Sequence, residues 1–217
     1  MVGGGIAASY DFDSALRSHM PLVFAFVLGL AFPLLLFTFR SLVVALTAVM
    51  LNLLSVAAAY GLLVIVFQHG VGASLLGFHA TGAIVSWLPL FLFVVLFGLS
   101  MDYHVFILSR IREAHERGLD ADVAIAHGIK STAGVVTAAA TVMVFVFAIF
   151  ATLSQLSLKQ LGVGLAAAVL IDTTLIRGVL LPATMKLLGS WNWYLPRWLG
   201  WLPARSERQR QPTPEAA

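Results

Sequence analysis

The sequence lacks cysteine altogether, which excludes a disulfide framework and any thiolate metal site. Its six histidines show no paired ligand spacing such as HxxxH or HExxH, so we expect neither a metal site nor another cofactor. Charge is also scarce, because only 11% of the residues are charged, against about a quarter in a soluble domain. With 60% hydrophobic residues, the chain has too few charges to cover a water-exposed surface. The composition therefore predicts an integral membrane protein.

Long apolar segments dominate what is present. No Asp, Glu, Lys or Arg occurs over residues 41–101. Each segment is long enough for the roughly 20 helical residues that cross a bilayer, and solid apolar runs favour helices over the alternating pattern of a barrel. The sequence thus predicts an all-α integral membrane bundle of five transmembrane helices, over residues 21–39, 42–67, 84–108, 131–153 and 158–188. Residues 1–20 are expected to be an extracytoplasmic connector, and residues 189–217 an aromatic interfacial segment followed by a disordered cytoplasmic tail.

Lys and Arg gather at one end of these spans. The loop over residues 110–130 and the tail from Lys186 onward are basic, whereas the opposite end has only Arg17 and Lys159. Because positive loops stay in the cytoplasm, we expect the C-terminus inside and the N-terminus outside an inner (plasma) membrane. The basic residues flank spans rather than forming a soluble face, so membrane lipids and not nucleic acid are the expected surroundings.

Small residues form stripes on the later spans. Lipid gives helices no hydrophobic reason to associate, so close contacts depend on small side chains. Gly134 in the fourth span and Gly162 and Gly164 in the fifth lie on such stripes. We therefore predict helix–helix contacts at these glycines.

Two carboxylates fall inside the spans, Asp102 in the third and Asp172 in the fifth. A charged Asp near the middle of a bilayer costs about 2.5–3.5 kcal/mol, so each acid needs a partner, a proton or a chemical role. Asp102 precedes Arg110, at the basic end, by roughly 12 Å of helix. Tyr103 places a hydroxyl next to it. The functional hypothesis is a proton-carrying site at Asp102 and Tyr103.

Structural alternatives remain open for both acids. A hydrogen bond to Thr137 or Thr141 on the following span would make Asp102 a packing residue, and Asn52 is a further candidate partner for a functional acid. Asp172 suits a functional and a structural role equally, so these residues form a possible secondary polar site. Arg177 lies five residues after Asp172, off its face on an α-helix, so a pair within that helix is not expected.

The stretch "FGLSMDYHVFILSRIREAHERG" resembles the Asp-Tyr helix and following loop of the MMPL family, within the resistance-nodulation-division (RND) superfamily of transporters. "AIAHGIKSTAGVVTAAATVM" and "VGLAAAVLIDTTLIRGVLLPATMKLLGSWNWYLPRWL" are similar to its next helix and its final helix and tail, and the resemblance covers roughly residues 1–201. It implies an exporter of lipids or other hydrophobic compounds driven by the proton-motive force. By position in the motif, Asp102 and Tyr103 take the family's proton relay role.

The sequence departs from that family in extent. Family members have two similar halves, each with an Asp-Tyr pair and a large extracytoplasmic domain. This chain resembles only the five-helix C-terminal portion of the second half, so we expect a fragment, a truncated product or a subunit. Its expected partner is the missing N-terminal half of the transporter or another subunit.

Two other classes of protein were weighed. An intramembrane aspartyl protease also needs two acids on neighbouring helices, but here the first acid follows "GLSM" rather than a GxGD loop. We therefore do not expect an enzyme. The alternative to transport is a sterol-sensing-like or accessory membrane scaffold that binds partners without moving protons.

Overall fold

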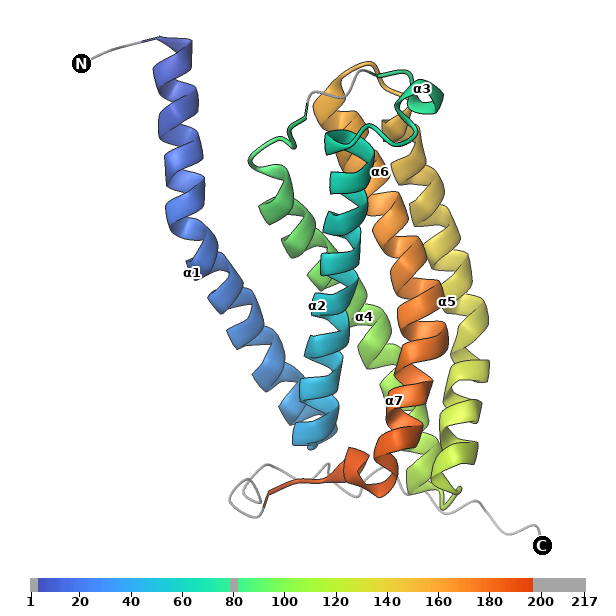
Figure 1. Cartoon of the computed structure of the whole chain (residues 1–217). Coiled ribbons are helices and arrows are strands. Elements are labelled where there is room, and N and C mark those ends of the chain that lie inside the picture. Colours follow the sequence, from blue (N-terminus) through green and yellow to red (C-terminus); the bar gives the residue numbers. More distant parts are fainter. Residues whose placement is uncertain (1–3, 79–81, 197–217) are drawn as a thin grey trace, which may run out of the picture.

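A computed structural model describes residues 4–78 and 82–196. Within these ranges the chain is helical and contains no strand, which confirms the all-α prediction (Figure 1). Five of the helices in the described ranges are long and apolar enough to cross a membrane. They are α1 (Gly5–Phe39), α2 (Leu42–Leu63) with its π-helical end η1 (Val64–Gln68), α4 (Leu88–Glu116), α5 (Ala121–Ala151), and a continuous segment of α6 (Leu156–Ile171), the π-helix η2 (Asp172–Leu180) and α7 (Leu181–Leu188). Short elements α3 (Ala73–Leu76) and η3 (Gly189–Trp193) lie at opposite ends of the molecule.

The helices extend beyond the predicted spans. α1 begins at Gly5 and runs through most of the segment expected to be a connector, and α5 begins at Ala121, ten residues before the predicted span. Hydropathy reports only the part of a helix that suits lipid, whereas backbone hydrogen bonds continue into polar sequence. The polar tail expected after residue 196 lies outside the described residues.

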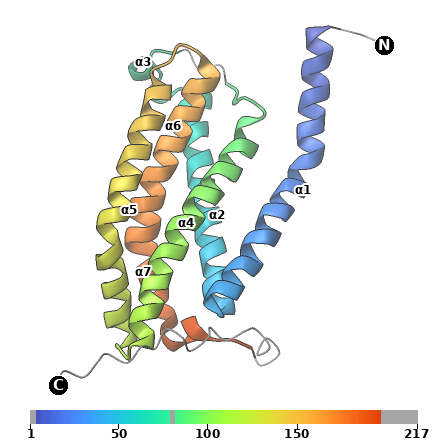
Figure 2. The same cartoon turned by 180° about the vertical axis from the view of Figure 1, so that it is seen from behind.

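The helices alternate in direction around a core formed by α2, α4, α5 and α6. α1 meets α2 where the two helices join and diverges from it toward the N-terminus (Figures 1 and 2). There α1 contacts the start of α4, where the Phe24 and Phe93 rings stack at 3.9 Å and the Ser86 hydroxyl donates to Asp13 Oδ1 at 2.6 Å. The second half of α1 is therefore packed against the bundle, from Phe24 to Phe39, and its first half is bonded to the bundle through Asp13.

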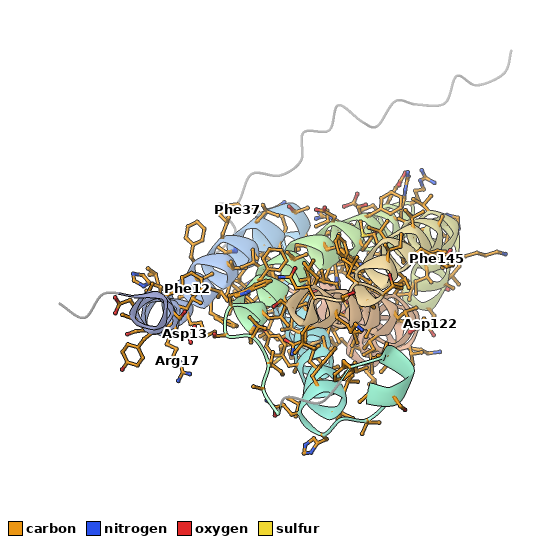
Figure 3. All side chains as sticks on the ribbon, turned by 90° about the horizontal axis from the view of Figure 1, so that it is seen from above. Phe12, Asp13, Arg17, Phe37, Asp122 and Phe145 are labelled. Atoms are coloured by element: carbon orange, nitrogen blue, oxygen red, sulfur yellow. The ribbon has the colours of Figure 1, made fainter. Side chains whose placement is uncertain are left out.

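The outer surface of the bundle is apolar. In the view along the bundle, Phe145 lies on the outer side of α5 (Figure 3). Leu22, Phe26 and Phe145 are 66%, 68% and 69% exposed. Large hydrophobic side chains exposed over the whole length of a helix match a lipid environment, so the chain is a multi-pass membrane protein.

Two glycines allow helix backbones to touch. A Cβ at Gly128 would lie 2.7 Å from the Ile111 backbone nitrogen, which fixes the crossing of α5 with α4. A Cβ at Gly162 would lie 2.6 Å from the Ala151 nitrogen, which fixes the contact of α6 with α5. The predicted contact at Gly162 is confirmed, whereas Gly134 has open space within 4 Å of an added Cβ, so the prediction for Gly134 was wrong. Residue size alone does not tell which stripe faces a neighbour.

At the basic end of the bundle, the start of α2 and η3 hold each other. Ser41 caps α2 by accepting a hydrogen bond from Val44 N at 3.2 Å, and its hydroxyl donates to the Asn192 carbonyl at 2.5 Å. The Trp193 ring stacks on His115 at the end of α4, with 5.1 Å between centroids. The first part of the predicted aromatic segment is thus packed against the helix ends, and its remainder lies outside the described residues.

Candidate functional site

Asp102 lies on the outer face of α4. Its side chain is exposed and, within the part of the chain that the structure describes, forms no hydrogen bond or ion pair. One turn earlier, a Cβ on Gly98 would meet no atom within 4 Å. Phe91 and Val94 continue the same stripe and are 44% and 42% exposed. α4 therefore presents an uncovered apolar stripe that carries one carboxylate.

Tyr103 turns from that stripe toward the bundle. Its side chain is half-buried, and its hydroxyl lies 3.6 Å from the sulfur of Met143 on α5. On its other side the Arg177 guanidinium lies over the ring, with Cζ 5.0 Å from the ring centroid. A cation at that distance is attracted by the electron-rich face of an aromatic ring. Tyr103 thus links the outer face with Asp102 to a charged group inside the bundle.

Asp172 and Arg177 form a buried ion pair. Their side chains are 7% and 2% exposed, and Arg177 Nε and Nη2 lie 2.9 and 2.8 Å from Asp172 Oδ2. Removing one member of such a pair typically costs about 3–5 kcal/mol, because the remaining charge is left unpaired away from water. The second intramembrane acid therefore has a fixed counter-charge, in contrast to Asp102.

The π-helix makes this pair possible. On an α-helix, side chains five residues apart lie about 140° from each other around the axis, and for this reason no pair was expected between Asp172 and Arg177. In η2 the hydrogen bonds follow the i→i+5 pattern, which brings residues five apart onto one face. The expectation from sequence was wrong because it assumed regular α-helical geometry through this segment.

Ser100 and Asn52 complete the buried network. The Ser100 hydroxyl lies 3.0 Å from both carboxylate oxygens of Asp172 and is also hydrogen-bonded to Asn52 Oδ1. Arg177 Nη2 donates to the hydroxyl of Ser100 at 2.7 Å and to its carbonyl oxygen. Asn52, a candidate partner from sequence, therefore reaches the acid through Ser100. Three helical segments, α2, α4 and η2, are joined by these polar contacts.

Two side chains in or next to the network, Arg177 and His104, have nitrogen atoms without a hydrogen-bond partner among the described residues. Arg177 Nη1 is buried without a hydrogen-bond partner among the described residues, and both ring nitrogens of the fully buried His104 are in the same state. His104 lies one turn after Ser100 on the inner face of α4. The network thus retains donors that its own residues do not satisfy.

Thr137 and Thr141 are not partners of either acid. The Thr137 hydroxyl donates to Ala133 O at 2.6 Å, and the Thr141 hydroxyl donates to Thr137 O at 2.7 Å. Both side chains are exposed on α5. Threonine hydroxyls commonly bond to the carbonyl one turn earlier in a helix, and this local bond replaces the expected bond to Asp102.

Ser100 and Arg177 were not among the site residues proposed from sequence. Helix geometry alone indicates the side of α4 on which Ser100 lies. Residues two apart on an α-helix lie about 200° apart around its axis, so Ser100 and Asp102 must face opposite sides of α4. Arg177 is visible in the sequence as a cation within an apolar span. Its pairing with Asp172, however, depends on the π-helix, which the sequence did not indicate. Only the structure therefore separates an inner network around Asp172 from an outer acid at Asp102.

Comparison with known proteins identifies the family that this sequence matches. The sequence matches the MMPL family over residues 1–214. It is 44% identical over 198 residues to "Mycolic acid-containing lipids exporter MmpL11" of Mycolicibacterium smegmatis, and 44% identical over 198 residues to "Heme uptake protein MmpL11" of Mycobacterium tuberculosis H37Rv. It is 36% identical over 205 residues to "Trehalose monomycolate exporter MmpL3" of Mycobacterium tuberculosis CDC 1551.

The chain belongs to the MMPL family. The three alignments cover 91%, 91% and 94% of this chain but 21%, 20% and 22% of the respective relatives. The chain thus spans about a fifth of the length of these relatives. The family resemblance noted from the Asp-Tyr motif is confirmed.

Proposed function

We propose that this chain is the C-terminal membrane part of an exporter of lipids or other hydrophobic compounds that is driven by the proton-motive force. Membership of the MMPL family and the lipid cargoes named for two of the relatives support transport of such compounds. The third relative is named for heme uptake, so its name agrees with a hydrophobic cargo but gives the direction as import rather than export. In this proposal Asp102 carries the proton, and Tyr103 relays it.

The observation that carries the proposal is the contrast between the two acids. Asp172 is held by Arg177 and Ser100, so losing its charge would leave a buried guanidinium unpaired. Asp102 has no such partner in the described chain and is exposed. A carboxylate without a fixed counter-charge can gain and lose a proton without breaking a buried ion pair. Asp102 is therefore the acid suited to carry a proton, and Asp172 is suited to remain charged.

The same observation supports a partner on this face. A charged Asp that faces lipid would cost about 2.5–3.5 kcal/mol. Because the chain spans about a fifth of its relatives, we infer that another part of the transporter covers the stripe from Phe91 to Asp102. That part is the N-terminal half of the same protein or a separate subunit. The chain would then transport only in that complete assembly.

We place the basic end of the bundle in the cytoplasm, with the assembly in the plasma membrane. The ion pairs of Glu113 with Arg110 and Arg117 and of Arg112 with Glu116 all lie near the end of α4, at the same end of the bundle as η3. At the other end, Lys159 is buried and donates to the Leu76 carbonyl. Arg17 is exposed at that end as well, but most of the accessible positive charge of the described residues lies at the basic end, which supports a cytoplasmic placement by the positive-inside rule.

The experiment is the substitution Asp102→Asn in the complete transporter. The amide keeps the size of the carboxyl but cannot titrate, so we expect proton-coupled export to fall to background while membrane insertion is unchanged. Asp122→Asn is the matched control, because Asp122 is an exposed acid whose ion pair with Lys186, at 3.3 Å, contributes little. Uptake of cargo into inverted vesicles with an acidic lumen is the measurement, because export from the cytoplasmic face is directed into the lumen of such vesicles. Undiminished export by the Asp102 variant would contradict the relay and favour an accessory scaffold.

A further inference from the structure

The Arg177 side chain has a position that its ion pair with Asp172 does not explain. A guanidinium that only neutralised Asp172 could lie anywhere around that carboxylate. Here it is fixed from two sides, by Asp172 on its own helix and by the hydroxyl and carbonyl of Ser100 on α4. These contacts orient the guanidinium plane, and the Cζ atom of Arg177 lies over the ring of Tyr103. The outer nitrogen Nη1 remains without a partner among the described residues.

We propose that Arg177 is a positioning residue of the proton site, which holds the ring of Tyr103 beside Asp102 through a cation–π contact. The inference rests on the proposed function, in which Asp102 and Tyr103 form the site. Asp172 is the anchor of this arrangement, and the π-helix η2 is the backbone feature that lets the anchor reach its cation. The buried network around Asp172 and the exposed acid Asp102 are then parts of one functional site.

The chemistry favours arginine in this role. Its guanidinium is planar and always charged, so it can donate to Asp172 and Ser100 from one edge while its face lies against an aromatic ring. Cation–π contacts are strongest where both partners are shielded from water, and the side chain of Arg177 is 2% exposed. The Tyr103 ring also packs against the hydrophobic core, and its hydroxyl approaches the weakly accepting sulfur of Met143. Arg177 is the described residue that places a charge against this ring.

The competing explanation is that Arg177 is only the counter-charge of Asp172. The double variant Arg177→Gln/Asp172→Asn separates the two ideas. It removes both charges together, so no unpaired charge is left in the bundle. Asparagine keeps the size of Asp172, and glutamine is shorter than arginine but can still form hydrogen bonds. A counter-charge would be dispensable in this variant, whereas a positioning residue would not.

The test uses the whole 217-residue chain in lipid nanodiscs, labelled with 3-fluorotyrosine at its four tyrosines. Fluorine NMR reports the surroundings of each ring, and Tyr103→Phe identifies the signal of Tyr103. Loss of the nearby charge moves this signal by itself, so the readout is its shape. We expect the single Tyr103 signal to broaden or split in the double variant as the ring takes up more than one position, while the signal of Tyr60 stays in place and shows that the bundle is folded. Arg112→Gln is the matched control, because Arg112 bonds to Glu116 and to the Thr38 carbonyl and should leave the Tyr103 signal unchanged.

A Tyr103 signal that stays single and equally sharp in the folded double variant would overturn the proposal. The single variant Arg177→Gln leaves Asp172 unpaired and is therefore not needed for the decision. The result is also independent of transport. If Asp102→Asn exports normally but the Tyr103 signal depends on Arg177, the proposed function fails and the positioning role stands. If export requires Asp102 but the signal does not depend on Arg177, the positioning role fails and the function stands.

Discussion

Replacing Gly162 by alanine adds one methyl group where the backbones of α5 and α6 touch. The new Cβ would lie 2.6 Å from the Ala151 nitrogen and from the Phe147 carbonyl oxygen, and 2.8 Å from the Phe150 Cβ. These atoms belong to or adjoin the helix backbone, so no side chain can swing aside and the two helices must separate. Overpacking of a well-packed site costs typically about 1–3 kcal/mol, and we expect the upper end of that range. Since alanine favours a helix over glycine by about 1 kcal/mol, the expected net loss of stability is about 2 kcal/mol.

Gly134→Ala is the control for this change. No atom lies within 4 Å of its added Cβ, so the variant should be as stable as the parent or slightly more stable. Gly164→Ala should fall between the two, because its Cβ would lie 3.2 Å from the flexible ends of Leu63 and Leu92. The assay is unfolding in mixed detergent and dodecyl sulfate micelles, followed by circular dichroism. Equal unfolding midpoints for the Gly162 and Gly134 variants would refute the backbone contact.

Two further predictions concern topology and the outer loop. A reporter fused after Gly118 should report a cytoplasmic location and one inserted within residues 68–83 an external one; the reverse pattern would overturn the proposed orientation. Lys159→Met removes the bond that the Lys159 ammonium group donates to the Leu76 carbonyl at 2.5 Å, so the loop around α3 should be cleaved faster in limited proteolysis than in a Lys159→Arg variant, and equal rates would show that this bond does not hold the loop.

The number and type of the helices could be predicted from the sequence because both follow from one strong constraint. In lipid every backbone group must bond within its own segment, so an apolar run of sufficient length has to be a helix. The ends of the helices are set by weaker local effects. α5 begins at Ala121, where a polar stretch remains helical, and its closest contact with α4 is at Gly128, outside the predicted span. Contacts in such polar extensions carry no hydropathy signal.

The site was predictable in part. Asp102 and Tyr103 are visible in the sequence because an acid in an apolar run is costly and therefore informative. The environment of Asp172 was not, because its ion pair depends on a change of helix type over Asp172–Leu180. The contact between Arg177 and Tyr103 depends in addition on how two helices far apart in the sequence are packed. Periodicity arguments apply one repeat to a whole helix and miss a local change in that repeat.

The two glycine contacts hold α5 against a different neighbour at each end. Gly128 fixes its basic end to α4, and the contact of Ala151 with Gly162 fixes its opposite end to α6. Val136 and Ala140 are buried between these contacts. Met143 lies in the same interval and touches the hydroxyl of Tyr103. A substitution that separates α5 from α4 or α6 at either glycine would therefore also displace Met143 from Tyr103.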